Sequence, residues 1–280
     1  MKESAMDLYC LLGNPVEHSK SPWIHARFAE LTGASLRYDK RLIPLDGFAQ
    51  GVQAFIDEGG RGCNVTVPFK FEAAALATQL SARAALAGAA NVLSFRAGAI
   101  LADNTDGAGL VNDIQNNAAL ALSGRHLLLL GAGGASAGVL GPLIEARPAS
   151  ITIANRTLSN ACVLVARHAA FALRHQTELL ASDLAGLTGS FDVVINGTAS
   201  SLGGADAPVP ASTLKPGALA YDMMYGPAAQ RFLAWARAHG AVARDGLGML
   251  VEQAAESFLI WRGVRPPSQQ VLTELIEAAL

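Results

Sequence analysis

Hydrophobic and polar positions over the first hundred residues predict short strands that alternate with helices. Residues 8–12 form an apolar run that ends at a Gly-Asn-Pro turn, which indicates a strand. Helical spacing follows over residues 22–31, closed by Gly33, and again over residues 48–58. This alternation predicts a mostly parallel sheet with helices covering it.

Residues 64–70, Asn-Val-Thr-Val-Pro-Phe-Lys, are the most informative segment. Val65 and Val67 alternate with polar neighbours, so we expect a short strand with one apolar face. Pro68 cannot donate to a sheet but suits the first position of a helix, expected over about residues 69–80. Lys70 would then lie in the first turn, where the helix dipole disfavours an ammonium group. A cation held at such an unfavourable position indicates that Lys70 has a functional role. The alternative is that Lys70 is a solvated lysine at a strand–helix corner.

The pattern restarts at His126 and becomes purely helical after Gly246. A buried strand at 127–130 runs into a glycine-rich turn at 131–138 and an apolar helix. Further helical stretches are expected at 113–122 and 160–171, and strands at 150–154, 191–195 and 219–222. The chain is therefore expected to be an α/β protein of two domains. The first would comprise residues 1–106, completed by C-terminal helices at 247–280, and the second residues 107–246.

Composition narrows the partners of the protein. The 280 residues are 51% hydrophobic and 16% charged, with a net charge of −2. No Lys/Arg cluster is present, so nucleic acid is not an expected partner. No uncharged apolar run could span a bilayer, and no signal-peptide core follows Met1, so no membrane is expected. Three scattered cysteines fit thiols in a reducing compartment, which favours a cytoplasmic protein without a metal site.

The glycine-rich turn is typical of a Rossmann dinucleotide-binding unit. A buried strand, a glycine turn and a helix together present backbone N–H groups to a pyrophosphate. Gly131 and Gly133 match the first two glycines of the G-x-G-x-x-G pattern, whereas Ser136 occupies the third position. The alternative is a tight strand–helix turn with no ligand.

The end of the next predicted strand favours NADP over NAD. NAD sites usually place Asp or Glu there, about 20 residues beyond the glycines, to bind the ribose hydroxyls. This chain has Asn155, Arg156 and Thr157 instead. An acid would repel a 2′-phosphate, whereas an arginine, a hydroxyl and an amide would hold it.

Two further polar clusters are candidates for a small-molecule site. Residues 103–107, Asp-Asn-Thr-Asp-Gly, lie where the first domain leads into the second, so Asp106 could face a cleft between domains. Alternatively, Asp106 would have a purely structural role as a helix cap or turn residue. Ser19 and Ser21 open the first helix and could cap it, or could hold a carboxylate at its N-terminus.

Together and in this order, these segments resemble the shikimate dehydrogenase family over nearly the whole chain. The resemblance implies an NADP-dependent enzyme that reversibly reduces 3-dehydroshikimate to shikimate on the route to chorismate and the aromatic amino acids. The segments that carry it are residues 13–15, 18–22, 64–70, 87–91, 103–107, 131–135, 155–157, 221–225 and 245–250, with Gln253 close behind.

The resemblance also implies the site residues. Lys70 and Asp106 would form the catalytic pair. The substrate pocket would be lined by Ser19, Ser21, Thr66, Asn91, Asp106, Tyr225 and Gln253. NADP would be contacted by Gly131, Ala132, Gly133, Gly134, Ala135, Asn155, Arg156, Thr157, Met223 and Gly246. Polar side chains of these types can pair with a carboxylate and three hydroxyls, and would penalise analogues that lack one of them.

In the implied reaction, hydride passes between the nicotinamide C4 and the substrate C3. Lys70 would donate a proton to the developing alkoxide during reduction and accept it during oxidation. Asp106 would orient the ammonium group and bind a substrate hydroxyl. Two departures from the family pattern are visible. Asn160 stands where a second arginine often completes the phosphate clamp, and residues 198–204 differ slightly from the family loop.

Two other functions remain open at this point. A quinate/shikimate dehydrogenase that uses NAD should carry an acid near Arg156 or a changed serine at Ser19 or Ser21, and neither is present. A non-catalytic, NADP-binding regulatory relative should have lost Lys70 or Asp106, and both are present. The sequence leaves open whether the protein is a monomer or a homodimer.

Overall fold

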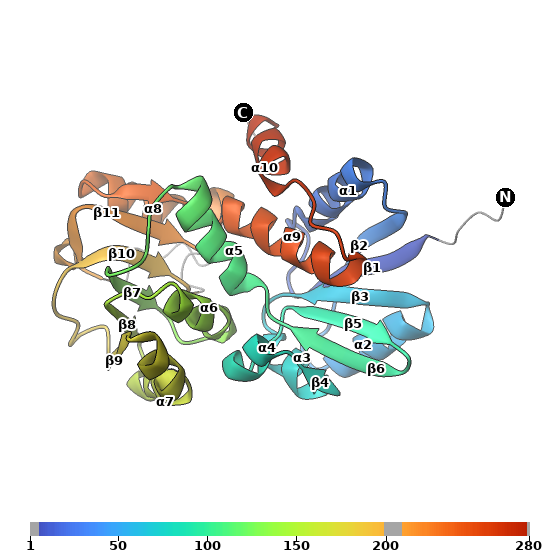
Figure 1. The fold of residues 1–280 in the computed structure, drawn as a ribbon, viewed down its shortest axis with the longest axis horizontal. Helices are drawn as coiled ribbons and strands as arrows, with labels where there is room; N and C mark the ends of the chain where they lie inside the picture. The colour runs from blue at the N-terminus through green and yellow to red at the C-terminus, as the bar shows by residue number, and fades with distance from the viewer. Residues whose placement is uncertain (1–5, 199–208, 279–280) are drawn as a thin grey trace. The chain divides into compact units, whose positions relative to one another are not determined.

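The computed structural model describes residues 6–198 and 209–278. The chain separates into two compact units, residues 1–109 with 250–280 and residues 110–249, each built around a six-stranded sheet (Figure 1). The predicted α/β class is confirmed. Of the segment 198–204, which differs slightly from the family loop, only Thr198 lies within the described residues. No described helix has the length and apolar character that a bilayer crossing requires.

The first unit contains a mixed sheet with the strand order β2-β1-β3-β5-β6-β4. Its strands are β1 (Asp7–Gly13), β2 (Leu36–Leu42), β3 (Gly60–Val65), β4 (Gln79–Leu80), β5 (Val92–Arg96) and β6 (Ala99–Asp103). β1 is parallel to β2 and β3, whereas β5 is antiparallel to β3 and β6. Two reversals make β6 parallel to β3, so the carboxyl ends of β1, β3 and β6 share one edge.

Helices cover both faces of this sheet (Figure 1). They are α1 (Ser21–Thr32), α2 (Phe48–Asp57), α3 (Lys70–Leu76), α4 (Ala82–Ala87), α9 (Leu247–Arg262) and α10 (Ser268–Glu277). Cys10 and Leu12 belong to the apolar cluster under α2 and α3, whereas Tyr9 stacks on Trp261 of α9 at 4.6 Å. Both faces of β1 are therefore buried, which explains its unbroken apolar sequence.

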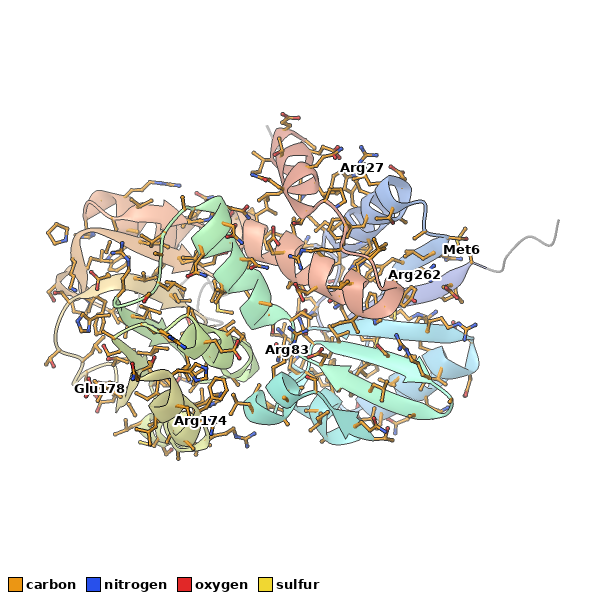
Figure 2. All side chains as sticks on the ribbon, viewed as in Figure 1. Met6, Arg27, Arg83, Arg174, Glu178 and Arg262 are labelled. Carbon is orange, nitrogen blue, oxygen red and sulfur yellow. The ribbon has the colours of Figure 1, made fainter. Side chains whose placement is uncertain are left out.

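The C-terminal helices pack back on the first unit, as expected. Arg27 of α1, labelled in Figure 2, forms an ion pair with Glu274 of α10, and its Nε lies 2.7 Å from Glu274 Oε2. Trp261 of α9 donates its indole N–H to the Leu93 carbonyl at 3.1 Å. These contacts join the end of the chain to β5 and α1.

The expected strand and helix around residues 64–70 were partly wrong. β3 ends at Val65 and Val67 is 40% exposed, whereas α3 begins at Lys70 and so places the lysine in its first turn, as expected. Pro68 follows a cis peptide bond within a turn and does not start the helix. The cause is non-local, because the Thr66 N–H donates to the carbonyl of Leu12 and ties the turn to the end of β1.

Helix α3 is also shorter than expected. It ends at Leu76, and Ala77 is extended with φ −70° and ψ 140°. The N–H of the next residue, Thr78, donates to the Ile100 carbonyl at 2.8 Å. Pairing with β6 thus replaces the last expected turn by the short strand β4.

The second unit has a fully parallel sheet with the order β12-β11-β10-β7-β8-β9. Its strands are β7 (His126–Leu130), β8 (Ser150–Ala154), β9 (Glu178–Ser182), β10 (Phe191–Asn196), β11 (Leu214–Asp222) and β12 (Val242–Arg244). In chain order this is the 3-2-1-4-5-6 arrangement of the Rossmann fold, whose ligands bind where the strand order reverses. That point lies between β7 and β10.

Helices of the second unit follow its strands in turn. They are α6 (Gly134–Glu145), α7 (Leu158–His175) and α8 (Gln230–Ala238), with short helical turns η3 (Ala211–Thr213) and η4 (Gly226–Ala229). The unit is entered through α5 (Asp106–Asn112), which continues as the π-helical turn η1 (Asp113–Asn117). The helix expected at 113–122 therefore begins earlier and ends earlier.

Asp113 anchors η1 inside the second unit. Its carboxylate is fully buried and accepts hydrogen bonds from Arg244 Nη2 at 2.6 Å and from the Tyr221 hydroxyl at 2.8 Å. Hydrogen bonding to Asp113 raises the pKa of the Arg244 guanidinium above its ordinary value. A buried carboxylate of this kind is stable only while these partners remain in place.

Candidate active site

Lys70 and Asp106 form a buried ion pair in the first unit. Lys70 Nζ lies 2.5 Å from Asp106 Oδ2, and the two residues are only 9% and 4% exposed. Each is the first residue of its helix, Lys70 of α3 and Asp106 of α5, near the edge where β3 and β6 end. The two residues that the resemblance pairs are therefore in direct contact. Two buried charges are compatible with folding when they are paired in this way.

The loop before Asp106 is anchored by a second acid. Asp103 accepts hydrogen bonds from Arg83 Nε at 2.6 Å and from Ser81 Oγ at 2.5 Å; Arg83 is labelled in Figure 2. Burial favours the neutral acid, but the hydrogen bonds from Arg83 and Ser81 prevail and hold the pKa of Asp103 below its ordinary value. Asp103 thus fixes the loop, and Asp106 is the acid that reaches Lys70.

Two amide side chains complete the cluster. Asn91 Nδ2 donates to Asp106 Oδ1 at 2.9 Å and lies 3.2 Å from Gln253 Oε1. Asn91 Oδ1 accepts the N–H of Thr105 at 2.8 Å, and Gln253 Nε2 donates to the Leu250 carbonyl at 2.9 Å. Four predicted site residues, Lys70, Asp106, Asn91 and Gln253, are thus joined by hydrogen bonds although they come from separate elements.

Ser19, Ser21 and Thr66 follow the strands that end at this same edge. The Ser21 N–H donates to Ser19 Oγ at 3.2 Å, and the two hydroxyl oxygens are 3.2 Å apart. Ser21 begins α1, and because its N–H is bonded to Ser19 Oγ and Pro22 has no N–H, the two serine hydroxyls are the groups that this helix start offers to an anion. Thr66 packs on Gly13, where a Cβ would lie 2.2 Å from Thr66 Cγ2, so only glycine fits there.

Sequence reasoning missed four polar residues of this cluster. Tyr38 donates its hydroxyl to Asn64 Oδ1 at 2.8 Å, and Asn64 Nδ2 donates to Ser257 Oγ at 2.9 Å. Thr105 Oγ1 lies 3.3 Å from Ser257 Oγ. The sequence did contain signals that could have identified three of these residues. Asn64 and Thr105 lie within the polar motifs, and Ser257 follows Gln253 by four residues and so lies on the same helix face.

The glycine turn of the second unit lies at the reversal of strand order. Gly131 has φ +98°, a conformation that favours glycine, and its N–H donates to the Ala154 carbonyl at 2.8 Å. A Cβ on Gly131 would lie 3.2 Å from the Gly197 carbonyl after β10. The loops after β7, β8 and β10 therefore meet at Gly131.

The first turn of α6 fits a pyrophosphate. The first helical hydrogen bond runs from the Ala137 N–H to the Gly133 carbonyl, so the N–H groups of residues 134–136 have no acceptor within the helix. Ser136 Oγ is buried without a hydrogen-bond partner, and the turn contains no acid. A Cβ on Gly133 would meet no atom within 4 Å, which leaves open space beside these donors. Ala132 and Ala135 lie in this same loop and turn.

The residues expected at a 2′-phosphate follow β8. Asn155 Nδ2 donates to the Thr157 carbonyl at 2.8 Å and so closes the loop into α7. Arg156 is exposed and pairs with no carboxylate among the described residues. Asn160, the candidate for a second clamp residue, lies exposed in the first turn of α7. An exposed guanidinium of this kind fits NADP, as do the donors of α6.

Three other predicted contacts lie after β11 and β12. Met223 follows β11, and its N–H donates to the Asn196 carbonyl at 2.9 Å. A Cβ on Gly246 would lie 2.3 Å from the Met223 carbonyl oxygen, so the backbones approach too closely for any other residue. Tyr225 is half-buried at the start of η4 and belongs to the second unit, unlike the other residues implied to line the substrate pocket.

Family profiles cover most of the chain. Residues 11–93 match the shikimate dehydrogenase substrate binding domain, residues 113–203 match shikimate/quinate 5-dehydrogenase, and residues 246–276 match the shikimate 5′-dehydrogenase C-terminal domain. A shikimate dehydrogenase (NADP(+)) from Acidovorax sp. (strain JS42) is 66% identical over 272 residues, which cover 97% of this chain and 96% of that protein.

Solved structures share the fold over its full length. An Ael1 enzyme from Pseudomonas putida matches with a TM-score of 0.85 at 45% identity, covering 96% of this chain and 98% of that one. A shikimate 5-dehydrogenase from Thermus thermophilus, in complex with NADP(H) and shikimate, matches with a TM-score of 0.83 at 29% identity, covering 98% and 100%. The sequence motifs, both sheets and these full-length relatives agree, and the chain belongs to the shikimate dehydrogenase family.

Proposed function

We propose that this protein catalyses the NADP-dependent, reversible reduction of 3-dehydroshikimate to shikimate, a step toward chorismate and the aromatic amino acids. The observation that carries the proposal is the buried Lys70–Asp106 pair, hydrogen-bonded to Asn91. The 66% identity to a shikimate dehydrogenase (NADP(+)) supports the same reaction. We assign substrate binding and catalysis to residues 1–106 with 247–280, and NADP binding to residues 107–246.

The polar groups of the site suit a small, hydroxylated carboxylate. Ser19 and Ser21, at the N-terminus of α1, would hold the substrate carboxylate. The residues that would pair with its hydroxyls are Thr66, Asn91, Asp106, Tyr225 and Gln253. A substrate analogue without a hydroxyl would leave some of these groups unpaired, which gives the site its selectivity.

The second unit would hold NADP. Residues 131–135 and the first turn of α6 would bind the pyrophosphate, and Ser136 Oγ is a further unpartnered donor there. Asn155, Arg156 and Thr157 would bind the 2′-phosphate, with Met223 and Gly246 beside the nicotinamide half. When bound, NADPH supplies the hydride that reduces the substrate carbonyl at C3.

Lys70 would control the proton in this reaction. As the carbonyl carbon gains hydride, its oxygen becomes an alkoxide, and the Lys70 ammonium would donate the proton that neutralises it. In the oxidation direction, the Lys70 amine would accept the hydroxyl proton. Asp106 would hold Nζ in place through the 2.5 Å contact. The charge on Lys70 also stabilises the alkoxide electrostatically.

One set of assays tests the proposal. The purified protein is assayed for NADPH and NADH oxidation with 3-dehydroshikimate, and for NADP and NAD reduction with shikimate and quinate. We expect turnover with the shikimate pair and NADP(H) to exceed every other combination. Absence of shikimate turnover with either cofactor would overturn the proposal, and a preference for quinate with NAD would identify the alternative enzyme.

The remaining expectations are the compartment and the assembly. We expect the cytoplasm, because the sequence has three widely spaced cysteines and no C-x-x-C pair. The expected assembly is a monomer or a homodimer, which light scattering of the purified protein would distinguish.

A further inference from the structure

Thr105 lies at the centre of the polar cluster behind the Lys70–Asp106 pair. It is fully buried, and its Oγ1 lies 3.0 Å from Asn91 Nδ2, 3.3 Å from Ser257 Oγ and 3.4 Å from Gln253 Oε1. Its backbone N–H also donates to Asn91 Oδ1 at 2.8 Å. A single side chain thus contacts both amides of the proposed site and a serine outside it.

The Asn91 amide fits this cluster in one orientation. With Oδ1 toward the Thr105 N–H, Nδ2 faces Asp106 Oδ1 at 2.9 Å. The reverse orientation would set two donors against each other at Thr105 and two acceptors against each other at Asp106. Asn91 thus binds Oδ1 of Asp106, and Lys70 binds Oδ2.

Ser257 joins Thr105 to α9. Its hydroxyl donates to the Gln253 carbonyl at 2.9 Å and accepts from Asn64 Nδ2 at 2.9 Å. Ser257 is fully buried, so a partner lost from it could not be replaced by bulk water. Thr105 and Ser257 therefore connect β3, the loop before α5 and α9 in one buried network.

We propose that Thr105 is a positioning residue for this reaction, with Ser257 as its partner. The Thr105 hydroxyl accepts a hydrogen bond from Asn91 Nδ2 and has one proton to donate, to Ser257 Oγ or to Gln253 Oε1. Through Asn91 it orients Asp106 toward Lys70. This inference rests on the proposed function and extends it to residues that need not touch the substrate. The hydrogen bonds of such a network depend on one another. Loss of the Thr105 hydroxyl should therefore change the geometry of the Lys70–Asp106 pair, although Thr105 does not contact Lys70.

The test replaces the hydroxyl while keeping the shape. Thr105→Val removes Oγ1 but keeps the backbone N–H, whereas Thr105→Ser keeps the hydroxyl. Thr177→Val is the matched control, because Thr177 is also buried and its hydroxyl donates to the Pro148 carbonyl at 3.0 Å in the second unit. We expect Thr105→Val to lower kcat roughly tenfold, the size of one buried hydrogen bond, with KM for NADP unchanged.

The other variants test whether the loss of kcat is specific to the hydroxyl of Thr105. Thr105→Ser should keep kcat near that of the wild type, and so should Thr177→Val. Ser257→Ala should lower kcat in the same direction, and it carries the test if Thr105→Val does not fold. The double variant should lose less than the product of the single losses, since the two hydroxyls share one network.

A second readout does not depend on activity. The side-chain amide signals of Asn91, assigned by their loss in Asn91→Asp, should exchange faster with solvent in Thr105→Val than in the wild type. Wild-type kcat together with unchanged Asn91 exchange in Thr105→Val would overturn the inference, as would a Thr105→Ser variant as slow as Thr105→Val. If the wild type does not turn over shikimate, the proposed function fails, and Asn91 exchange still decides whether Thr105 positions the cluster.

Discussion

Lys70 Nζ lies 2.5 Å from Asp106 Oδ2, although 36 positions separate the two residues in the chain. The contact joins the first residue of α3 to the first residue of α5. The strand order explains it, because β3 and β6 run in the same direction and deliver both helices to one edge of the sheet. The proposed chemistry therefore depends on the sheet as much as on the two side chains.

Replacement of the lysine tests the proton transfer. Lys70→Met keeps the length of the side chain but removes the proton donor, so kcat should fall roughly 10²- to 10⁴-fold, the usual range for a general acid. NADP binding, measured by calorimetry, should be unchanged. Lys215→Met is the control, because Lys215 pairs with Asp192 at the start of β11 and belongs to neither proposed binding site, so it should leave kcat unaffected. A Lys70→Met protein with wild-type kcat would remove Lys70 from its proposed role.

Replacement of Arg156 tests the choice of cofactor. Arg156→Ala removes the guanidinium proposed to pair with the 2′-phosphate, so kcat/KM with NADPH should fall roughly tenfold, a modest loss because the group is exposed. Activity with NADH should not change, since NADH has no 2′-phosphate. Arg167→Ala, on an exposed face of α7, should change neither value. An equal fall with both cofactors would argue against the pairing.

Gly248 should tolerate no side chain. A Cβ there would lie 1.9 Å from Asp113 Oδ1, so Gly248→Ala must displace the buried carboxylate from Arg244. We expect a loss of at least about 2 kcal/mol in the free energy of unfolding, measured by urea denaturation. Gly51→Ala is the comparison, because its Cβ would meet the end of the flexible Ile43 side chain at 2.6 Å. Equal stability of the two variants would contradict this account.

His25 should make the protein sensitive to acid. It is fully buried in contact with aromatic rings, including Tyr38 stacked at 4.1 Å, and neither ring nitrogen has a hydrogen-bond partner. Burial lowers its pKa to about 3, and the neighbouring Asn64 opposes the shift. Below the ordinary value of 6.5, the unfolded chain therefore binds a proton that the folded protein does not.

The resulting prediction has a defined pH window. Between about pH 6.5 and pH 3, His25 should cost the folded state about 1.4 kcal/mol of stability for each pH unit of acidification, and nothing above that window. His25→Phe should remove this contribution. The measurement is the difference in unfolding free energy between wild type and variant as a function of pH. A difference that does not change with pH would show that His25 does not titrate in this way.

Local patterns predicted the regular elements well where neighbouring residues decide them. Residues 8–12 and 22–31 were expected as a strand and a helix, and β1 and α1 contain them. The edge strand β2 was not expected, because only Tyr38 of its seven residues is buried and its sequence shows little apolar pattern. The β5–β6 hairpin was also missed, although Gly98, with φ +77°, marks its turn.

The site was predicted only in part, because some of its residues lie in local motifs and others are brought in by tertiary contacts. Lys70, Asp106 and the glycine turn stand in motifs that can be read locally, whereas Ser257 is recognisable only from its contacts. The resemblance paired Asp106 with Lys70, and the tertiary structure supplies the physical reason why Asp103 is not the partner. Arg83 and Ser81 hold Asp103, which leaves Asp106 for the lysine.

The sequence by itself determined the element types, the glycines of the close turns, and the residues with chemistry to offer. Only the tertiary structure decided that residues 66–69 form a turn before the helix. It alone also placed Thr105 and Ser257 in the hydrogen-bond network that includes Asn91 and Asp106. The physical reason is the range of the interactions. Side-chain periodicity and turn preferences act within a few residues, whereas the partner of a buried charge or amide is fixed by the order in which distant strands pair.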